Sequence, residues 1–267
     1  MPYPTPTLHS PISSSLDFTV KKYAALLASL EGAGYSFQSF EAFLQTPGER
    51  VIILRHDVDL RPQNALTFAR IQAERGMTGS YYFRAVPQSW DERVILEIAD
   101  LGHRIGYHYE SLTTCGGDVE RAIRDFERNL TALRQLAPVS TICMHGSPLS
   151  KYDSKDLWRT HSYHDYGIQG EPYFDIDFNQ VAYLTDTGRR WDGTKVSVRD
   201  KVVSHQAQTY ASSTDQLIAA ADRGSLPNQI MCTFHPQRWN NNPYVWMEEL
   251  VSQNVKNIIK RYFFVSR

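Results

Sequence analysis

Four short segments of this chain place reactive side chains directly after apolar runs. They are the segments 55–59, 102–110, 141–148 and 231–239, and each carries aspartate, glutamate or histidine. Short apolar runs bounded by turn residues are typical of buried strands. Parallel α/β folds place their active sites at the carboxyl ends of such strands. We therefore expect the four segments to form one functional site.

The first segment carries two carboxylates, Asp57 and Asp59, two positions apart. Side chains alternate along a strand, so both carboxylates are expected on one face and His56 on the other. Two close carboxylates repel each other unless a cation lies between them or one of them is protonated. A metal ligand beside a general base would satisfy this condition. The alternative is that Asp59 only caps the following helix.

Each of the other three segments ends an apolar run with a histidine: His108, His145 or His235. An imidazole in such a place can bind a metal ion or transfer a proton. Three histidines at separate strand ends, beside an aspartate pair, favour a functional site over three separate structural roles. Gly106, two positions before His108, is expected to leave room for a ligand or another backbone. His103 lies in the turn after a helix, where a structural role is expected.

The elements that carry these segments alternate regularly between helix and strand. We expect helices over 20–32, 64–75, 92–100, 118–136, 214–223 and 245–261. We expect strands over 51–54, 79–86, 104–111, 140–145 and 229–235, with three strand-like runs (YFDIDF, VAYLTD and KVSVRD) between 173 and 200. This alternation predicts a mainly parallel sheet with right-handed crossovers. The chain length favours its closure into a barrel within one domain, 18–267, after a loose leader, 1–17.

Composition narrows the class of protein. A formal net charge of -1 over 267 residues argues against a nucleic-acid-binding protein. The sequence contains no run of about 18 apolar residues, so we expect no transmembrane helix. The leader also lacks the apolar run of an export signal. Three cysteines without a Cys-x-x-Cys pair fit a reducing compartment. We expect a cytoplasmic protein.

The helix 245–261 is expected to pack on the barrel, with contact to a membrane surface through Lys256, Lys260 and Arg261 as the alternative.

Taken together, the segments resemble the polysaccharide deacetylases of the NodB-homology type, carbohydrate esterase family four. Asp57-Val58-Asp59 resembles the Asp-x-Asp form of that family's first motif, where one aspartate is the base and the other binds the metal. Gly102 to His108 matches the pattern Gly-His-x-Ile-Gly-x-His, which ends in a metal ligand. His235 matches the position of a general-acid histidine. The resemblance implies an α/β fold, a distorted (β/α) barrel with about seven strands.

One position departs from the family's pattern. The family usually has a second histidine four residues after the first ligand, and Leu112 occupies that position here. Because leucine cannot bind a metal, either another residue is the third ligand or metal binding is weak or lost. Glu110 and His145 are the candidates. We favour His145, which lies where the family's third motif lines the pocket, and expect Glu110 to orient the ring of His108 from outside the coordination sphere.

The resemblance implies a metal-dependent hydrolase that removes an N-acyl group, most simply acetyl, from an amino sugar used in surface polysaccharide assembly. Zinc fits the mixed nitrogen and oxygen ligand set best. Two alternatives stay open: a metal-free saccharide-binding protein, and a hydrolase of a small non-sugar amide. The expected site residues are Asp57 and His235 for catalysis, Asp59, His108 and His145 for the metal, and Arg84, Trp191, Arg238 and Trp239 for contacts with the sugar, with packing as their alternative role.

Overall fold

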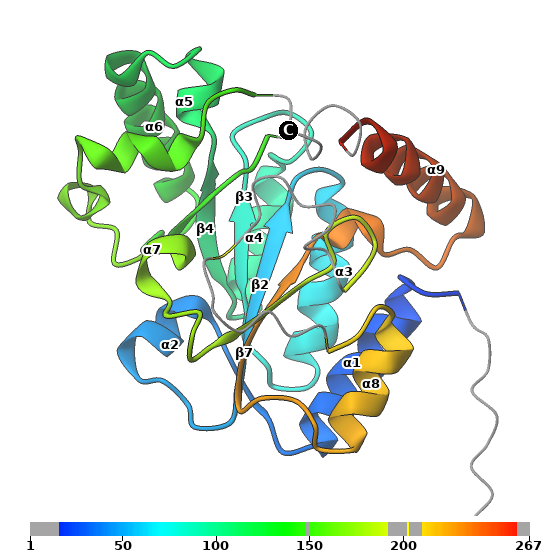
Figure 1. Ribbon diagram of the computed structural model, residues 1–267. Coiled ribbons are helices and arrows are strands. Elements are labelled where there is room, and N and C mark those ends of the chain that lie inside the picture. The colour runs from blue at the N-terminus through cyan, green and yellow to red at the C-terminus, as the bar shows by residue number, and fades with distance from the viewer. Residues whose placement is uncertain (1–15, 148–149, 192–201, 203–209, 261–267) are drawn as a thin grey trace, which may run out of the picture.

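A curled parallel sheet forms the centre of the molecule (Figure 1). The computed structural model describes residues 16–147, 150–191, 202 and 210–260, without the side chains of 256–260. Within these residues the sheet has seven strands in the order β5-β4-β3-β2-β7-β6, and β1 also pairs with β2. The strands are β1 Ser36–Gln38, β2 Val51–Val58, β3 Ser80–Phe83, β4 Arg104–Tyr109, β5 Ile142–Met144, β6 Ala182–Thr185 and β7 Gln229–Phe234. The sheet makes a half-barrel in a single domain, so the expected distorted α/β barrel is confirmed.

Helices follow most strands and cover the outer face of the sheet (Figure 1). The α-helices are α1 Val20–Gly32, α2 Phe40–Gln45, α3 Pro62–Ala73, α4 Glu92–Asp100, α5 Ser111–Thr114, α6 Val119–Arg134, α7 Pro172–Asp175, α8 Thr214–Asp222 and α9 Pro243–Lys260. The 3-10 helices are η1 Ser154–Arg159, η2 Tyr163–Tyr166 and η4 Pro236–Arg238. Their starts have local causes: the side chain of Asp91, for example, accepts the backbone N–H of Val94 and so begins α4.

Two apolar layers lie on the two faces of the sheet. The outer layer joins Leu54, Tyr81 and other outward side chains to the helices. The inner layer fills the amino end of the half-barrel, where Phe40 of α2 packs with Ile53 and Met231. β2 is buried along its whole length because both layers cover it. The carboxyl ends of the strands are left for polar side chains.

Most of the expected elements are present, and one difference has a clear local origin. The run YFDIDF does not form a strand: Glu171 caps a short helix, α7, in which Pro172 takes the first position that proline tolerates. VAYLTD contains β6, whereas KVSVRD lies outside the described residues. β1 and α2 were not expected from the sequence. Gly102 ends α4 as expected, with a φ of 89° that other residues rarely adopt.

The N-terminal end of the described chain lies against the first turns of α9 and the start of α8. Of the expected leader, only Leu16 and Asp17 lie in the described part. The backbone carbonyl of Asp17 accepts the indole N–H of Trp246 at 2.7 Å, and its carboxylate accepts the backbone N–H of Thr214 at 2.9 Å. Among the described residues, no helix combines the length and apolar character needed to cross a bilayer.

Helix α9 packs on the domain, as expected, but its most buried side chains are polar. The exposed fractions of Glu249 and Gln253 are only 7% and 4%, because these polar residues face the protein. The ring centroid of Trp246 lies 4.7 Å from the guanidinium carbon of Arg189. Val251, expected on the packed face, is 56% exposed. The helix therefore turns an apolar face to the outside.

Candidate metal centre

The carboxylates of β2 reach the rim of the half-barrel in different ways. Asp57 is the penultimate residue of β2, and Asp59 lies just beyond the strand, where its N–H bonds to the carbonyl of Asp57 at 3.2 Å. Both carboxylates face His108, at 3.7 Å and 3.5 Å from its Nε2. His56 points to the other face, as expected, where it contacts Tyr23 and burial lowers its pKa to about 3.

Asp59, His108 and His145 form what we call the metal cluster. Asp59 Oδ1 lies 3.5 Å from the Nε2 atom of each histidine, and the three atoms all lie within 4.8 Å of one another. The two rings stand almost perpendicular, at 81°. Asp59 Oδ1 is buried and has no hydrogen-bond partner among the described residues. Three strands thus bring three ligand atoms to one point.

The hydrogen bonds of the two rings decide which nitrogens face that point. His108 Nδ1 lies 2.9 Å from the carbonyl oxygen of Cys143, and His145 Nδ1 lies 3.0 Å from a carboxylate oxygen of Glu110. Both partners can only accept, so each Nδ1 carries a proton and donates it. In the neutral rings both Nε2 lone pairs then point toward Asp59 Oδ1. In that state three acceptors converge without a donor, an arrangement that either a proton on one ring or a bound metal ion would relieve.

The dimensions of the metal cluster fit zinc. Ligand atoms at about 2.0–2.2 Å from a tetrahedral zinc ion lie about 3.3–3.6 Å apart. The two distances of 3.5 Å from Asp59 Oδ1 match this spacing. Two imidazoles and one carboxylate are also a ligand set that zinc accepts. The residues present could therefore hold a metal ion without a histidine at position 112.

A second ligand group shares His108 but suits a cation less well. It comprises Asp57, His108 and Cys143, all buried. Asp57 already receives two hydrogen bonds from the guanidinium of Arg55, at 2.9 Å and 2.7 Å. This positive charge repels a metal ion from Asp57. The metal cluster is the better site, and Asp57 remains beside it as a carboxylate that Arg55 holds.

The charges of the metal cluster stabilise one another. Burial alone would raise the pKa of Asp59, but the nearby imidazoles of His108, His145 and His235 lower it well below its usual range. Burial would lower the pKa of His108, but Asp57 and Asp59 raise it. A proton on His108 therefore does what a cation would do, and protons and metal ions compete for the cluster.

Glu110 and Arg84 hold His145 in place. Arg84 binds both oxygens of Glu110, at 2.8 Å and 2.9 Å, and also reaches the carbonyl of Asp59 at 3.3 Å. Although burial opposes it, the bond from His145 and the charge of Arg84 lower the pKa of Glu110 to about 2. The expectation that Glu110 orients His108 is therefore wrong: it orients His145, while Cys143 orients His108.

A second group of polar residues surrounds Asp186 at the ends of β6 and β7. We call Asp186, His235, Arg238 and Trp239 the Asp186 cluster. The carboxylate of Asp186 accepts the backbone N–H of His235 at 3.0 Å and lies 2.6 Å from its Nδ1. It also accepts from Arg238 at 2.9 Å and from the indole of Trp239 at 2.6 Å. Because Nδ1 donates to Asp186, His235 Nε2 is the nitrogen left for the site.

The two clusters are neighbours. Strand β2 pairs with β7 so that His56 lies opposite Phe234, which places Asp57 and His235 at the next positions of adjacent strands. Gln237, which lies between His235 and Arg238 in the sequence, donates to Asp59 Oδ2 at 3.1 Å. A carboxylate, Asp57, and a histidine, His235, therefore lie at the ends of adjacent strands beside the metal cluster.

Several expected contacts with a sugar are corrected by the structure. Trp239 is fully buried, with its ring 4.9 Å from that of Phe18, so it belongs to the core. Trp191 is also buried and donates to Thr214. Arg238 is turned to Asp186, and Arg84 is held by Glu110. The two tryptophans therefore lack an exposed face for a sugar, and the two arginines are engaged by carboxylates of the protein.

The space beside Gly106 is filled by the protein and not by a ligand. A Cβ atom at this position would lie 2.4 Å from the ring of Tyr82. The hydroxyl of Tyr82 in turn lies 3.2 Å from Oγ1 of Thr141. The expected room for a ligand is therefore occupied by a ring. His103 has a structural role as expected, since its two ring nitrogens bond to the backbone of Gly79 and Ala69.

Three residues of the site were not expected from the sequence. Asp186 directly follows β6, and the same reasoning about strand ends would have found it in the run VAYLTD. Arg55 precedes Asp57 by two positions, so strand alternation places it on the same face. Gln237 carries no comparable signal, because η4 determines where its side chain points.

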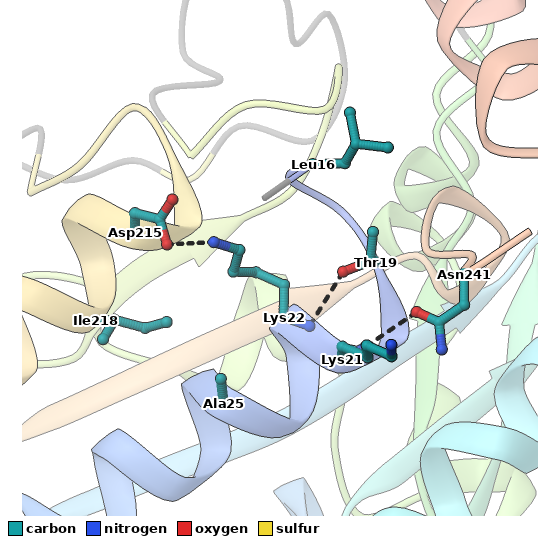
Figure 2. Close-up of a pocket in the computed structure, with 8 residues that line it drawn as sticks. All are labelled: Leu16, Thr19, Lys21, Lys22, Ala25, Asp215, Ile218 and Asn241. Carbon is teal, nitrogen blue, oxygen red and sulfur yellow. Dashed lines mark hydrogen bonds and ion pairs between the residues drawn. The ribbon is translucent and has the colours of Figure 1, made fainter. Parts of the chain in front are cut away.

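A cavity of about 430 Å³ lies elsewhere, between α1 and α8 (Figure 2). It shares no residue with either cluster. Its wall includes the ion pair of Lys22 with Asp215 and the apolar side chains of Leu16 and Ile218.

Comparisons with protein-family models and with curated protein sequences found no match. The geometry of the two clusters is therefore the basis for a function.

Proposed function

We propose that this protein is a zinc-dependent hydrolase that removes an N-acyl group, most simply acetyl, from an amino sugar. The observation that carries the proposal is the convergence of Asp59 Oδ1 with two histidine Nε2 atoms at tetrahedral spacing and without a donor. A base and a histidine with a carboxylate partner lie beside it. This is the set of groups that metal-assisted hydrolysis of an amide requires.

Zinc bound at Asp59, His108 and His145 would lower the pKa of a water molecule and polarise the acyl carbonyl. The chain itself supplies the proton transfers. Asp57, oriented by both bonds from Arg55, accepts the proton of the attacking water. His235 donates a proton from Nε2 to the departing amine, and Asp186 stabilises its imidazolium form through Nδ1.

The substrate is the part of the proposal that rests most on the sequence resemblance. An amino sugar of a surface polysaccharide precursor is the substrate we favour. A small non-sugar amide would need the same zinc and the same two proton transfers, so a panel of both substrate types separates these candidates. Release of acetate from N-acetylated amino sugars, with no turnover of cyclic amides, is the expected result.

The direct test compares zinc binding by the wild-type chain and His145→Ala. We expect one zinc ion per wild-type chain and a loss of affinity of at least about 100-fold in the variant, because one of three protein ligands is removed. Titration calorimetry and elemental analysis measure this. The fold should persist, since His145 lies at the rim, and circular dichroism checks it.

His161→Ala is the matched control, because His161 is a half-buried histidine whose ring, among the described residues, bonds only to the neighbouring Thr160. It should bind zinc as the wild type does. Equal affinity in His145→Ala and wild type would contradict the proposed ligand set. A wild-type chain that binds no divalent ion would leave the metal-free saccharide-binding protein as the better hypothesis.

A further inference from the structure

Helix α9 buries polar side chains against the domain and exposes a row of apolar ones. Four apolar side chains along it are exposed: Tyr244 by 84%, Met247 by 53%, Val251 by 56% and Val255 by 51%. Their spacing of three, four and four residues places them on one face of the helix. Leaving such a stripe in water is unfavourable, so the stripe indicates a partner.

The opposite face of α9 already has its partners within the domain. Glu249 and Gln253 are buried there, Trp246 contacts Arg189 and Asp17, and Glu248 at the edge pairs with Arg61 at 3.0 Å. The helix is thus held in a fixed orientation, and its apolar stripe faces outward as a consequence. Rotating the helix to bury the stripe would break these contacts.

The charge of the sequence around the stripe indicates the kind of partner. Residues 250–267 contain four basic residues, Lys256, Lys260, Arg261 and Arg267, and no acidic one. Since the whole chain has a formal charge of -1, the remaining residues 1–249 carry -5. In the sequence, the same helical spacing continues to Ile258 and Tyr262. An apolar stripe followed by a basic segment is typical of a helix that lies on an anionic membrane surface.

The position of α9 relative to the metal cluster agrees with such a role. The helix contacts η4, which directly follows the carboxyl end of β7. Figure 1 shows α9 at the end of the molecule toward which the strands point. We propose that the stripe Tyr244, Met247, Val251 and Val255 seats the protein on an anionic lipid surface. If the proposed function holds, the strand ends would then work on a substrate carried by that membrane.

Vesicle co-sedimentation tests the membrane surface. The wild-type chain should bind vesicles of phosphatidylcholine with phosphatidylglycerol, and binding should weaken with salt because the basic segment is screened. Replacing Met247, Val251 and Val255 together by Ser should weaken binding by about tenfold or more, because the buried apolar area is lost. Leu96→Ser, which changes a side chain 42% exposed on α4, is the matched control and should bind as the wild type does.

Three outcomes would overturn the proposal. The first is that the wild type does not bind anionic vesicles, and the second is that the triple serine variant binds them as tightly as the wild type. The third is a dimer in sedimentation equilibrium that the triple serine substitution dissociates while vesicles do not bind, which would make a second copy the partner. None of these measurements uses zinc or turnover, so the membrane contact can fail while the proposed hydrolase stands, and the reverse.

Discussion

The metal cluster and the Asp186 cluster lie side by side but differ in how the protein satisfies their polar atoms. Asp186 accepts four hydrogen bonds from its own cluster, at 2.6–3.0 Å. Asp59 Oδ1 has no partner among the described residues and faces two ring nitrogens at 3.5 Å. One cluster is complete with protein atoms alone, and the other leaves a buried carboxylate oxygen that a proton on a histidine or a metal ion could satisfy. We infer that proton transfer and metal binding are divided between them.

The largest expected effect tests this division at the Asp186 cluster. His235→Ala should slow turnover by roughly 10²–10⁴-fold, the usual contribution of a general acid, and leave the zinc content unchanged. Steady-state kinetics and elemental analysis of the same preparation measure both quantities. Loss of zinc from this variant would mean that the two clusters are one site and that His235 is a ligand.

Asp186→Asn should affect stability more than zinc binding. Its charge balances Arg238 in the core, and burial of the carboxylate is offset by His235 and Arg238, which lower its pKa. Leaving a buried cation unpaired costs about 3–5 kcal/mol, and urea unfolding measures this. Asp165→Asn, a change at an exposed carboxylate, should cost little. A zinc affinity reduced in Asp186→Asn without a loss of stability would contradict the division.

Glu171 gives a third case, a buried carboxylate held mainly by backbone N–H groups. It accepts from Met144 and Tyr173, at 2.9 Å and 2.6 Å, but burial raises its pKa to about 7 from 4.5. The folded state therefore holds the proton more tightly than the unfolded chain does. The free energy of unfolding should fall by about 3 kcal/mol as the pH rises from 4.5 through 7.

Glu171→Gln removes this titration, so its unfolding free energy should show a flatter pH dependence than that of the wild type. Parallel slopes for the two proteins, measured by urea unfolding between pH 5 and pH 8, would show that Glu171 does not hold a proton in this range.

The smallest expected effect concerns the metal cluster. Glu110→Gln keeps an acceptor for His145 but removes the charge shared with Arg84, so zinc affinity should fall by about 10–100-fold. Competition with a chelator measures this. An affinity unchanged from the wild type would show that Arg84 and Glu110 do not position His145. A loss as large as that of His145→Ala would instead make Glu110 a ligand.

The sequence predicts the sheet and the metal cluster because both depend on local patterns. Apolar runs predict the strands, and the residue after each run predicts which side chains meet at the rim. Side-chain direction after the strand end is not local, which is why Trp239 and Glu110 were misassigned. η4 turns Trp239 back onto Phe18, and Arg84 turns Glu110 toward His145. The exposed stripe on α9 does not follow from the sequence pattern, because the helix buries the polar Glu249 and Gln253 instead of Val251.

The close fit of Tyr82 over Gly106 ties two positions of neighbouring strands together during sequence change. A side chain at 106 could enter only if residue 82 became smaller in the same lineage, and Thr141 would then lose the hydroxyl that it meets. Random mutagenesis should therefore recover changes at 106 only as compensated pairs. In directed evolution, changing residues 82 and 106 together would alter the packing beside His108 without replacing a proposed metal ligand.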